Sequence, residues 1–214
     1  MCHSVIRVDL HLEPAEARVI GALIEKEITT PEYYPLSLNA LVNACNQKSN
    51  RDPVVDYDEE LVDSVLESLR HKGLLTTVTG AGSRVPKYGH RLTDQLNLGR
   101  REIAILCELM LRGPQTSGEL RNRTERMHRF DDIAEIESVL DRMQELVMKL
   151  PRRPGEKEGR YAHLLSGEPA LEAAEEPQPV RQDRVTALEA EMAQLRQEFE
   201  ALKEQFAEFR RQFE

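Results

Sequence analysis

Apolar side chains near the N-terminus recur every three or four positions, which is the spacing of a helix with one buried face. The first such stretch starts at Pro14, a residue suited to the first turn of a helix, and ends where Thr-Thr-Pro occupies residues 29–31. The second follows Ser37, a common N-cap, and the third covers about residues 58–72 and stops at Gly73. The pattern therefore predicts three helices.

Strand-forming residues follow the third helix. Residues 74–78 (Leu-Leu-Thr-Thr-Val) and 84–91 flank a turn at residues 80–83 that contains two glycines. This arrangement predicts a β-hairpin. Three helices followed by a hairpin is the order of a winged helix, a variant of the helix-turn-helix. We therefore expect a winged-helix domain in residues 1–95.

The same order of elements recurs in residues 96–165. The predicted elements are a helix over residues 98–112, a short helix capped at 116–117, a long helix from about 131, and strands at 147–150 and 161–165. The third helices also match in sequence, since Asp-Ser-Val-Leu-Glu at 63–67 corresponds to Glu-Ser-Val-Leu-Asp at 137–141. Repeated order together with repeated sequence indicates an internal duplication. The fold class predicted is α+β and mostly helical, with two tandem winged helix-turn-helix domains.

A different pattern begins beyond residue 165. Residues 166–180 are rich in Pro, Glu and Ala and have no apolar period, so we expect a flexible acidic linker. Residues 181–214 then carry apolar side chains in alternating steps of three and four residues. The apolar positions are Val185, Leu188, Met192, Leu195, Phe199, Leu202, Phe206, Phe209 and Phe213. This unbroken heptad predicts a left-handed coiled-coil helix.

The charges beside the heptad bear on the partner of this helix. In a parallel pair, three contacts between g and e positions would join opposite charges, namely Arg184–Glu189, Glu191–Arg196 and Glu198–Lys203. They favour a parallel homodimer through the C-terminal coiled coil. Two alternatives stay open: a single helix folded back on the globular part, and a coiled coil with a different protein.

Composition narrows the class of protein. The chain has 214 residues and a formal net charge of -9, and no apolar run is long enough for a transmembrane helix. The apolar run at the N-terminus contains Arg7 and Asp9, which argues against a secretory signal. We therefore expect a cytoplasmic protein without membrane contact. Cys45 and Cys107 lie among apolar residues and are expected to be buried thiols.

The sequence holds no motif that points to catalysis. It lacks the glycine-rich phosphate loop with its lysine, the dinucleotide fingerprint, the H-E-x-x-H zinc motif and the G-x-S-x-G nucleophile motif. The six histidines show no ligand spacing, and Cys2 with His3 makes a poor metal site at a chain end. We therefore expect a protein that is not an enzyme and has neither metal nor cofactor.

Several runs of residues resemble the bacterial YceH family. They are residues 12–21, 29–32, 34–37, 44–54 and 84–88 in the first repeat, and 111–116 and 118–121 in the second. The resemblance covers residues 12–167, and a charged, coiled tail is also common in this family. It implies tandem winged-helix domains. It implies no reaction, because no biochemical role is established for the family.

Winged helices usually bind DNA through the third helix, with wing contacts to phosphate. The candidate DNA-binding residues are Lys48, Ser49, Asn50 and Arg51 before the third helix of the first repeat, Arg84 and Lys87 on its wing, Arg121, Arg123, Arg126 and Arg129 around the second helix of the second repeat, and Arg152 and Arg153 on its wing. Our first interpretation is regulatory binding of double-stranded DNA by a dimer.

The charge of the third helices favours a second interpretation. Residues 58–72 carry five acids against Arg70 and Lys72, and residues 131–149 carry six acids against Arg142 and Lys149. Such helices would repel a phosphate backbone. The alternative is a protein–protein interaction scaffold that uses tandem winged helices without direct DNA binding.

Overall fold

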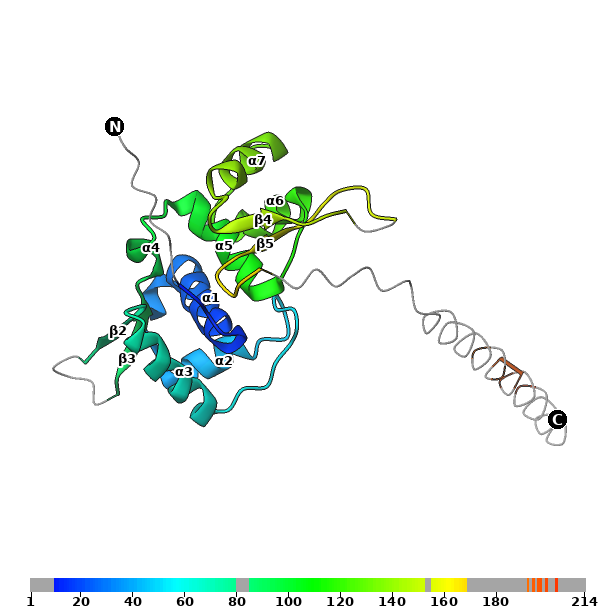
Figure 1. The fold of residues 1–214 in the computed structure, drawn as a ribbon. Helices are drawn as coiled ribbons and strands as arrows, with labels where there is room; N and C mark the ends of the chain where they lie inside the picture. The colour runs from blue at the N-terminus through cyan, green and yellow to red at the C-terminus, as the bar shows by residue number, and fades with distance from the viewer. Residues whose placement is uncertain are drawn as a thin grey trace, which may run out of the picture. The chain divides into compact units, whose positions relative to one another are not determined.

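A computed structural model describes residues 10–79, 85–152 and 155–168 of the chain (Figure 1). In the C-terminal segment it describes only residues 192, 194, 196, 197, 199 and 203, all helical. The chain divides into two compact units, Met1–Ala170 and Leu171–Glu214. Described residues of the first unit form an α+β fold, in which seven α-helices accompany two small sheets.

The first repeat contains the helices and the hairpin that the apolar spacing predicts. Its elements are α1 (Pro14–Thr29), a 3-10 turn (Pro31–Tyr33), β1 (Leu36–Ser37), α2 (Leu38–Cys45), α3 (Glu59–His71), β2 (Leu75–Val78) and β3 (Lys87–His90). Ser37 caps α2 by accepting a hydrogen bond from the Ala40 amide, and Asp58 caps α3 in the same way through the Leu61 amide. These caps satisfy amides that the helices leave unpaired, and so fix where they begin.

The first repeat also has a strand that the sequence pattern does not predict. The two residues of β1 pair with β3, which gives an antiparallel sheet in the order β1-β3-β2. Leu36 lies opposite Tyr88, and both side chains are buried. A strand of two residues is too short to show alternation, and Ser37 is at the same time the cap of α2.

The second repeat follows the same order. A short helix, α4 (Leu92–Gln95), connects the repeats and was not expected from the sequence. The remaining elements are α5 (Arg100–Arg112), α6 (Ser117–Arg123), a 3-10 turn (Thr124–Arg126), α7 (Ile133–Arg142), β4 (Val147–Lys149) and β5 (Tyr161–His163). Thr116 caps α6 and Asp132 caps α7. The helices and strands predicted here are confirmed, with α7 ending several residues before residue 149.

Strand pairing repeats as well. β4 pairs with β5, and Gln115, just before α6, forms an isolated bridge with Tyr161. This bridge occupies the place that the Leu36–Tyr88 pair has in the first repeat. Both repeats therefore have a first helix, two more helices and a hairpin whose last strand pairs back to the segment before the second helix, through strand β1 in the first repeat and through a single bridge in the second.

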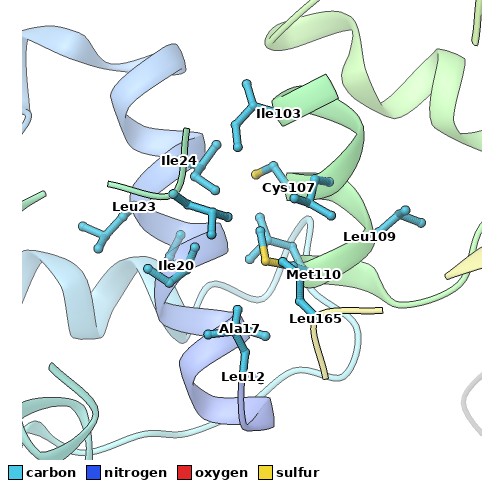
Figure 2. Close-up of a cluster of buried hydrophobic side chains, with 14 of the residues drawn as sticks. Leu12, Ala17, Ile20, Leu23, Ile24, Ile103, Cys107, Leu109, Met110 and Leu165 are labelled. Carbon is cyan, nitrogen blue, oxygen red and sulfur yellow. The ribbon is translucent and has the colours of Figure 1, made fainter. Parts of the chain in front are cut away.

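The two repeats share one core, formed where α1 packs against α5 (Figure 1). Figure 2 shows Ile20 and Ile24 of α1 facing Cys107 and Met110 of α5. Cys107 donates a hydrogen bond to the carbonyl of Gly21, at 3.3 Å from sulfur to oxygen. Cys45 and Cys107 are buried free thiols, as the sequence predicts.

Few residues of the second unit are described, so few of the predicted heptad positions can be compared with the structure. Met192 and Phe199, two of the nine heptad positions, lie in helical backbone with exposed side chains. The other positions, Val185, Leu188, Leu195, Leu202, Phe206, Phe209 and Phe213, lie outside the described residues. Most of the predicted linker, residues 169–180, does so too, and the proposed domain boundaries remain predictions.

Candidate interaction site

The third helices, α3 and α7, present the same acidic face twice. Val62, Val65, Leu66 and Leu69 of α3 are buried, as are Ile136, Val139 and Leu140 of α7. On the opposite side, Asp63 and Glu67 of α3 are exposed, and so are their counterparts Glu137 and Asp141 of α7. We call these four side chains the acidic face. The third helices of both repeats therefore share a buried apolar side and two exposed acids at corresponding positions.

Helix stability does not account for the acidic face. Acids in a first turn, such as Glu59 and Glu60 of α3, interact favourably with the positive end of the helix. Asp63, Glu67 and Asp141 lie beyond the first turn, where that benefit is absent or reversed. Only one of them has an ion-pair partner among the described residues: Glu67, which contacts Arg70 one turn later. Asp63, Glu137 and Asp141 thus have no ion-pair partner among the described residues, although the charges of Glu137 and Asp141 contribute to the raised pKa of Lys149.

The loop between α2 and α3, which the sequence suggests as a DNA contact, makes contacts inside the protein instead. Lys48 and Ser49 are exposed, but Arg51 is buried. Its guanidinium lies 2.8 Å from the Glu25 carboxylate of α1 and also donates to the carbonyls of Ala44 and Asn50. Arg51 is therefore committed to the protein interior. This geometry argues against its predicted role in DNA binding and gives it a structural one.

The same loop joins the first repeat to the second. Arg112 of α5 donates to the side chain of Asn50, whose φ of 58° lies in the left-handed region. The Asp52 amide donates to the Leu111 carbonyl at 3.0 Å. Asn50, predicted to contact DNA, thus contacts Arg112 instead. Residues 44–54, one of the runs that resemble the YceH family, therefore contain contacts that join the two repeats. We call Asn50, Arg51 and Asp52, with their partners Glu25, Leu111 and Arg112, the clasp.

Two buried carboxylates, that of Glu25 in the clasp and that of Glu108 beside it, have pKa values that are shifted in opposite directions. Burial alone would raise the pKa of Glu25, but hydrogen bonds and charge from Arg51 more than offset it, so the pKa is lowered. Burial raises the pKa of Glu108 on α5 to about 7, with Arg112 opposing the shift and Glu25 adding to it. The charged form of Glu108 is less well stabilised than that of Glu25, because within the described residues its only ion pair is with the Nε of Arg112, at 3.3 Å.

Of the remaining basic candidates for DNA binding, some bond to other groups of the protein and others are exposed. Arg123 is tied to Gln115 at 2.7 Å and to Glu119 at 3.6 Å, and Arg121 donates to the Asp131 carbonyl at 2.9 Å. The other basic candidates that the structure describes, Lys87, Arg126, Arg129 and Arg152, are exposed. Within the described part of the chain, Arg126 and Arg129 have no side-chain hydrogen bond or ion pair. Arg84 and Arg153 lie outside the described residues.

Two surface pockets were not foreseen from the sequence. One of about 460 Å³ is lined by Arg70, Leu75, Thr76, Thr77, His90, Arg91 and Asp94. The other, of about 410 Å³, is lined by Glu27, Ile28, Pro31, Thr93, Arg100 and Ile103. A hydrogen bond of 2.7 Å joins the carboxylate of Glu27, in one pocket, to Nε2 of His90, in the other. No sequence signal could have found them, because helices, strands and connections each contribute only one or a few residues.

Other kinds of site are not seen in the described residues. They contain no group of three or more His, Cys, Asp or Glu side chains placed to hold a metal ion. None of their helices combines the length and the apolar character needed to cross a bilayer.

Comparison with known proteins places this chain in a family. A family model described as "Protein of unknown function, DUF480" matches residues 12–156. A UPF0502 protein of Solibacter usitatus is 55% identical over 97% of this chain and all of its own length. One of Aeromonas hydrophila is 49% identical over 94% of this chain and 99% of its own, and one of Citrifermentans bemidjiense is 60% identical over 75% and 76%. The chain therefore belongs to the UPF0502 family, which is the YceH family that its sequence resembles.

Proposed function

We propose that this protein is a non-enzymatic interaction scaffold, built from two tandem winged helices, that binds a protein partner through α3 and α7. Support for the winged-helix assignment comes from the repeated order of elements and from the backbone pairing of each hairpin to the segment before the second helix, by strand β1 in the first repeat and by the Gln115–Tyr161 bridge in the second. In this assignment α3 and α7 are the helices that a DNA-binding relative would insert into the major groove.

The acidic face carries the proposal. Asp63 and Glu67, together with Glu137 and Asp141, would meet phosphates if these helices entered a DNA groove. Affinity for DNA depends largely on neutralised phosphates, so carboxylates at the centre of the contact oppose it. Complementary charge instead favours and steers a basic protein segment.

The test compares a variant in which the acidic face is neutralised with a control variant of the same net charge. The variant Asp63→Asn/Glu67→Gln/Glu137→Gln/Asp141→Asn removes four exposed negative charges. The control Glu32→Gln/Asp56→Asn/Glu125→Gln/Glu158→Gln removes four exposed charges elsewhere, so net charge is equal in the two. Affinity capture followed by quantitative mass spectrometry should recover a basic partner with the wild type and the control, and at least about tenfold less with the acidic-face variant. Equal recovery with both variants contradicts the proposal.

A second candidate, binding of double-stranded DNA, is favoured by one observation. Arg126 and Arg129 are exposed beside α6 and have no partner within the described residues, with Arg121 nearby in the chain. The test is an electrophoretic shift on random duplexes at about 50 mM salt, where non-specific binding is strong. Binding that the triple change of Arg121, Arg126 and Arg129 to Ala abolishes would support this candidate. No shift at micromolar protein would remove it.

We infer further that the protein is a cytoplasmic homodimer joined through the heptad of residues 185–213. The unbroken 3-4 spacing and the complementary flanking charges support the dimer, and the two free buried thiols fit a reducing compartment. Light scattering on the chain lacking residues 181–214 should give the mass of a monomer. An unchanged mass would place the interface elsewhere.

A further inference from the structure

Strand β2 is an open edge of the first repeat's sheet. The order β1-β3-β2 leaves one side of β2 without a neighbouring strand, and the hairpin lies at the periphery of the fold (Figure 1). Arg91 donates to the Leu74 carbonyl at 2.8 Å, so alternate residues from Leu74 onward bond to β3. The amides and carbonyls of Leu75 and Thr77 therefore point away from the sheet.

A pocket and exposed side chains lie along β2. Leu75, Thr76 and Thr77 all line the pocket of about 460 Å³. His90 of β3 and Arg91 also line this pocket, so it borders β2 without marking its open edge. Thr76, Thr77 and Val78 are also exposed. An added strand would find unpaired backbone groups and exposed side chains along this strand.

The second repeat protects the corresponding edge, and the first does not. β4 contains Lys149, whose ammonium lies 5.2 Å from the centre of the Tyr161 ring, and Pro151 follows two residues later. Lysine and proline are common devices that keep edge strands from pairing with other chains. β2 reads Leu-Thr-Thr-Val and has neither. Because the two modules share one topology, the difference marks β2 as an edge left available.

Positive charges lie at both ends of β2. Arg91 is exposed and, in the part of the chain that the structure describes, its guanidinium has no partner. Arg70 lines the same pocket but is ion-paired with Glu67, and Asp94 is the single acid of the lining. At the other end, exposed Lys87 lies opposite Val78. Pairing of β2 with β2 of a second copy would bring Arg91 of one copy toward Lys87 of the other, which is unfavourable.

We propose that β2 accepts an extended acidic segment of a protein partner as a fourth strand, with carboxylates of that segment attracted by Arg91 at one end and Lys87 at the other. Main-chain hydrogen bonds to Leu75 and Thr77 supply affinity, and the flanking charges select the segment, as in other cases of β-strand addition. This inference rests on the proposed scaffold function and names a second contact, separate from the acidic face.

The experiment uses the full chain and peptides selected on it from a random peptide display library. Fluorescence anisotropy then gives the affinity of each synthetic peptide. Thr77→Pro removes the outward amide, whereas the control Thr77→Ala keeps it, and proline is tolerated where an edge amide faces solvent. We expect Thr77→Pro to weaken binding at least about tenfold and Thr77→Ala to change it less than about twofold. Arg91→Ala should weaken binding of an acidic peptide but not of its Gln/Asn analogue.

Hydrogen exchange of the wild type gives a readout that does not depend on a variant folding. Peptide binding should slow exchange at the amides of Leu75 and Thr77, which have no partner in the sheet. Peptides that leave these amides unprotected, or that bind Thr77→Pro as tightly as the wild type, overturn the inference. So does recovery of no peptide binder below about 100 μM, a weak affinity for strand addition.

Two further outcomes distinguish a failure of strand addition at β2 from a failure of the proposed scaffold function. Peptides that are lost with the acidic-face variant but bind Thr77→Pro normally overturn strand addition and leave the scaffold function standing. A concentration-dependent rise in mass that Thr77→Pro abolishes would show a second copy on the edge and overturn the assignment of an acidic partner.

Discussion

Arg51 and Glu25 form a buried ion pair, 2.8 Å between Nη2 and Oε2, with no exposed part of the Arg51 side chain. The pair joins the loop after α2 to the middle of the inter-repeat interface, because Glu25 lies on α1 and α1 packs on α5. Asn50, beside Arg51, accepts from Arg112 of α5. The loop after α2 therefore adds polar contacts to the apolar packing of α1 on α5 that joins the two repeats.

Removing either member of this pair should strongly destabilise the protein. Arg51→Ala leaves the Glu25 carboxylate with Lys26, at 3.1 Å, as its remaining cation and leaves the Ala44 carbonyl without its Arg51 donor. Breaking a buried pair typically costs about 3–5 kcal/mol. The measurement is the free energy of unfolding by urea at neutral pH. Arg101→Ala, which breaks an exposed pair with Glu135 at 3.1 Å, is the control and should cost less than about 1 kcal/mol. Equal losses in the two variants would show that the clasp is not structural.

This pair also shows what sequence reasoning cannot reach. An arginine in a polar loop has the same local pattern whether it faces a phosphate or a carboxylate of its own chain. Glu25 lies 26 residues before Arg51, and Asn50 lies 62 residues before Arg112, so only the fold brings them together. The family resemblance identified the run, but a resemblance in sequence does not distinguish a binding loop from a clasp.

Features contained within one helix were predictable. The helices of both repeats followed from apolar spacing, because burial of one face is a local property of a helix. The acidic character of α3 and α7 followed from the same reading, since exposed and buried positions alternate with a known period. Strand β1 and the Gln115–Tyr161 bridge did not, because one or two residues carry no period.

Gly21 lies where α1 and α5 cross, and a side chain there should be costly. A Cβ on Gly21 would lie 2.9 Å from the side chain of Leu111, which is itself buried. Gly21→Ala should therefore destabilise the protein by about 1–3 kcal/mol, the usual cost of overpacking, despite the better helix propensity of alanine. Thermal and urea unfolding would measure it.

Gly118 in α6 is the matched control for Gly21. A Cβ there would meet nothing closer than 3.9 Å, so Gly118→Ala should stabilise the protein by about 0.5–1 kcal/mol. If both alanine variants shift stability in the same direction, the close approach of α1 and α5 at Gly21 is not what requires glycine.

Glu108 should make the free energy of unfolding fall as the pH rises from about 4.5 to 7. Its pKa is raised to about 7 by burial, so between about pH 4.5 and 7 the folded state holds a proton that the unfolded state has released. Glu108→Gln keeps the neutral shape of the side chain. It should match the wild type near pH 5 and exceed it at pH 8 by up to about 3 kcal/mol, at about 1.4 kcal/mol per pH unit.

The exposed Glu145 provides a control for that change. Glu145→Gln removes one carboxylate without removing a buried one, so its stability should follow the wild type at every pH. The interpretation of Glu108 would be wrong if Glu108→Gln were no more stable than the wild type at pH 8.

His163 should oppose Glu108 over nearly the same range. Burial lowers the pKa of His163 to about 4, and its Nδ1 has no hydrogen-bond partner within the described residues. Between about pH 4 and 6.5 the unfolded state therefore binds a proton that the folded state excludes, and stability rises with pH. Because the slope from Glu108 has the other sign, the wild type should change little between about pH 5 and 6.5. Urea unfolding should show stability that falls with pH in His163→Gln, rises in Glu108→Gln, and is nearly flat in the double variant. A wild type and a His163→Gln variant with the same slope would mean that His163 binds a proton as readily in the folded protein as in the unfolded chain.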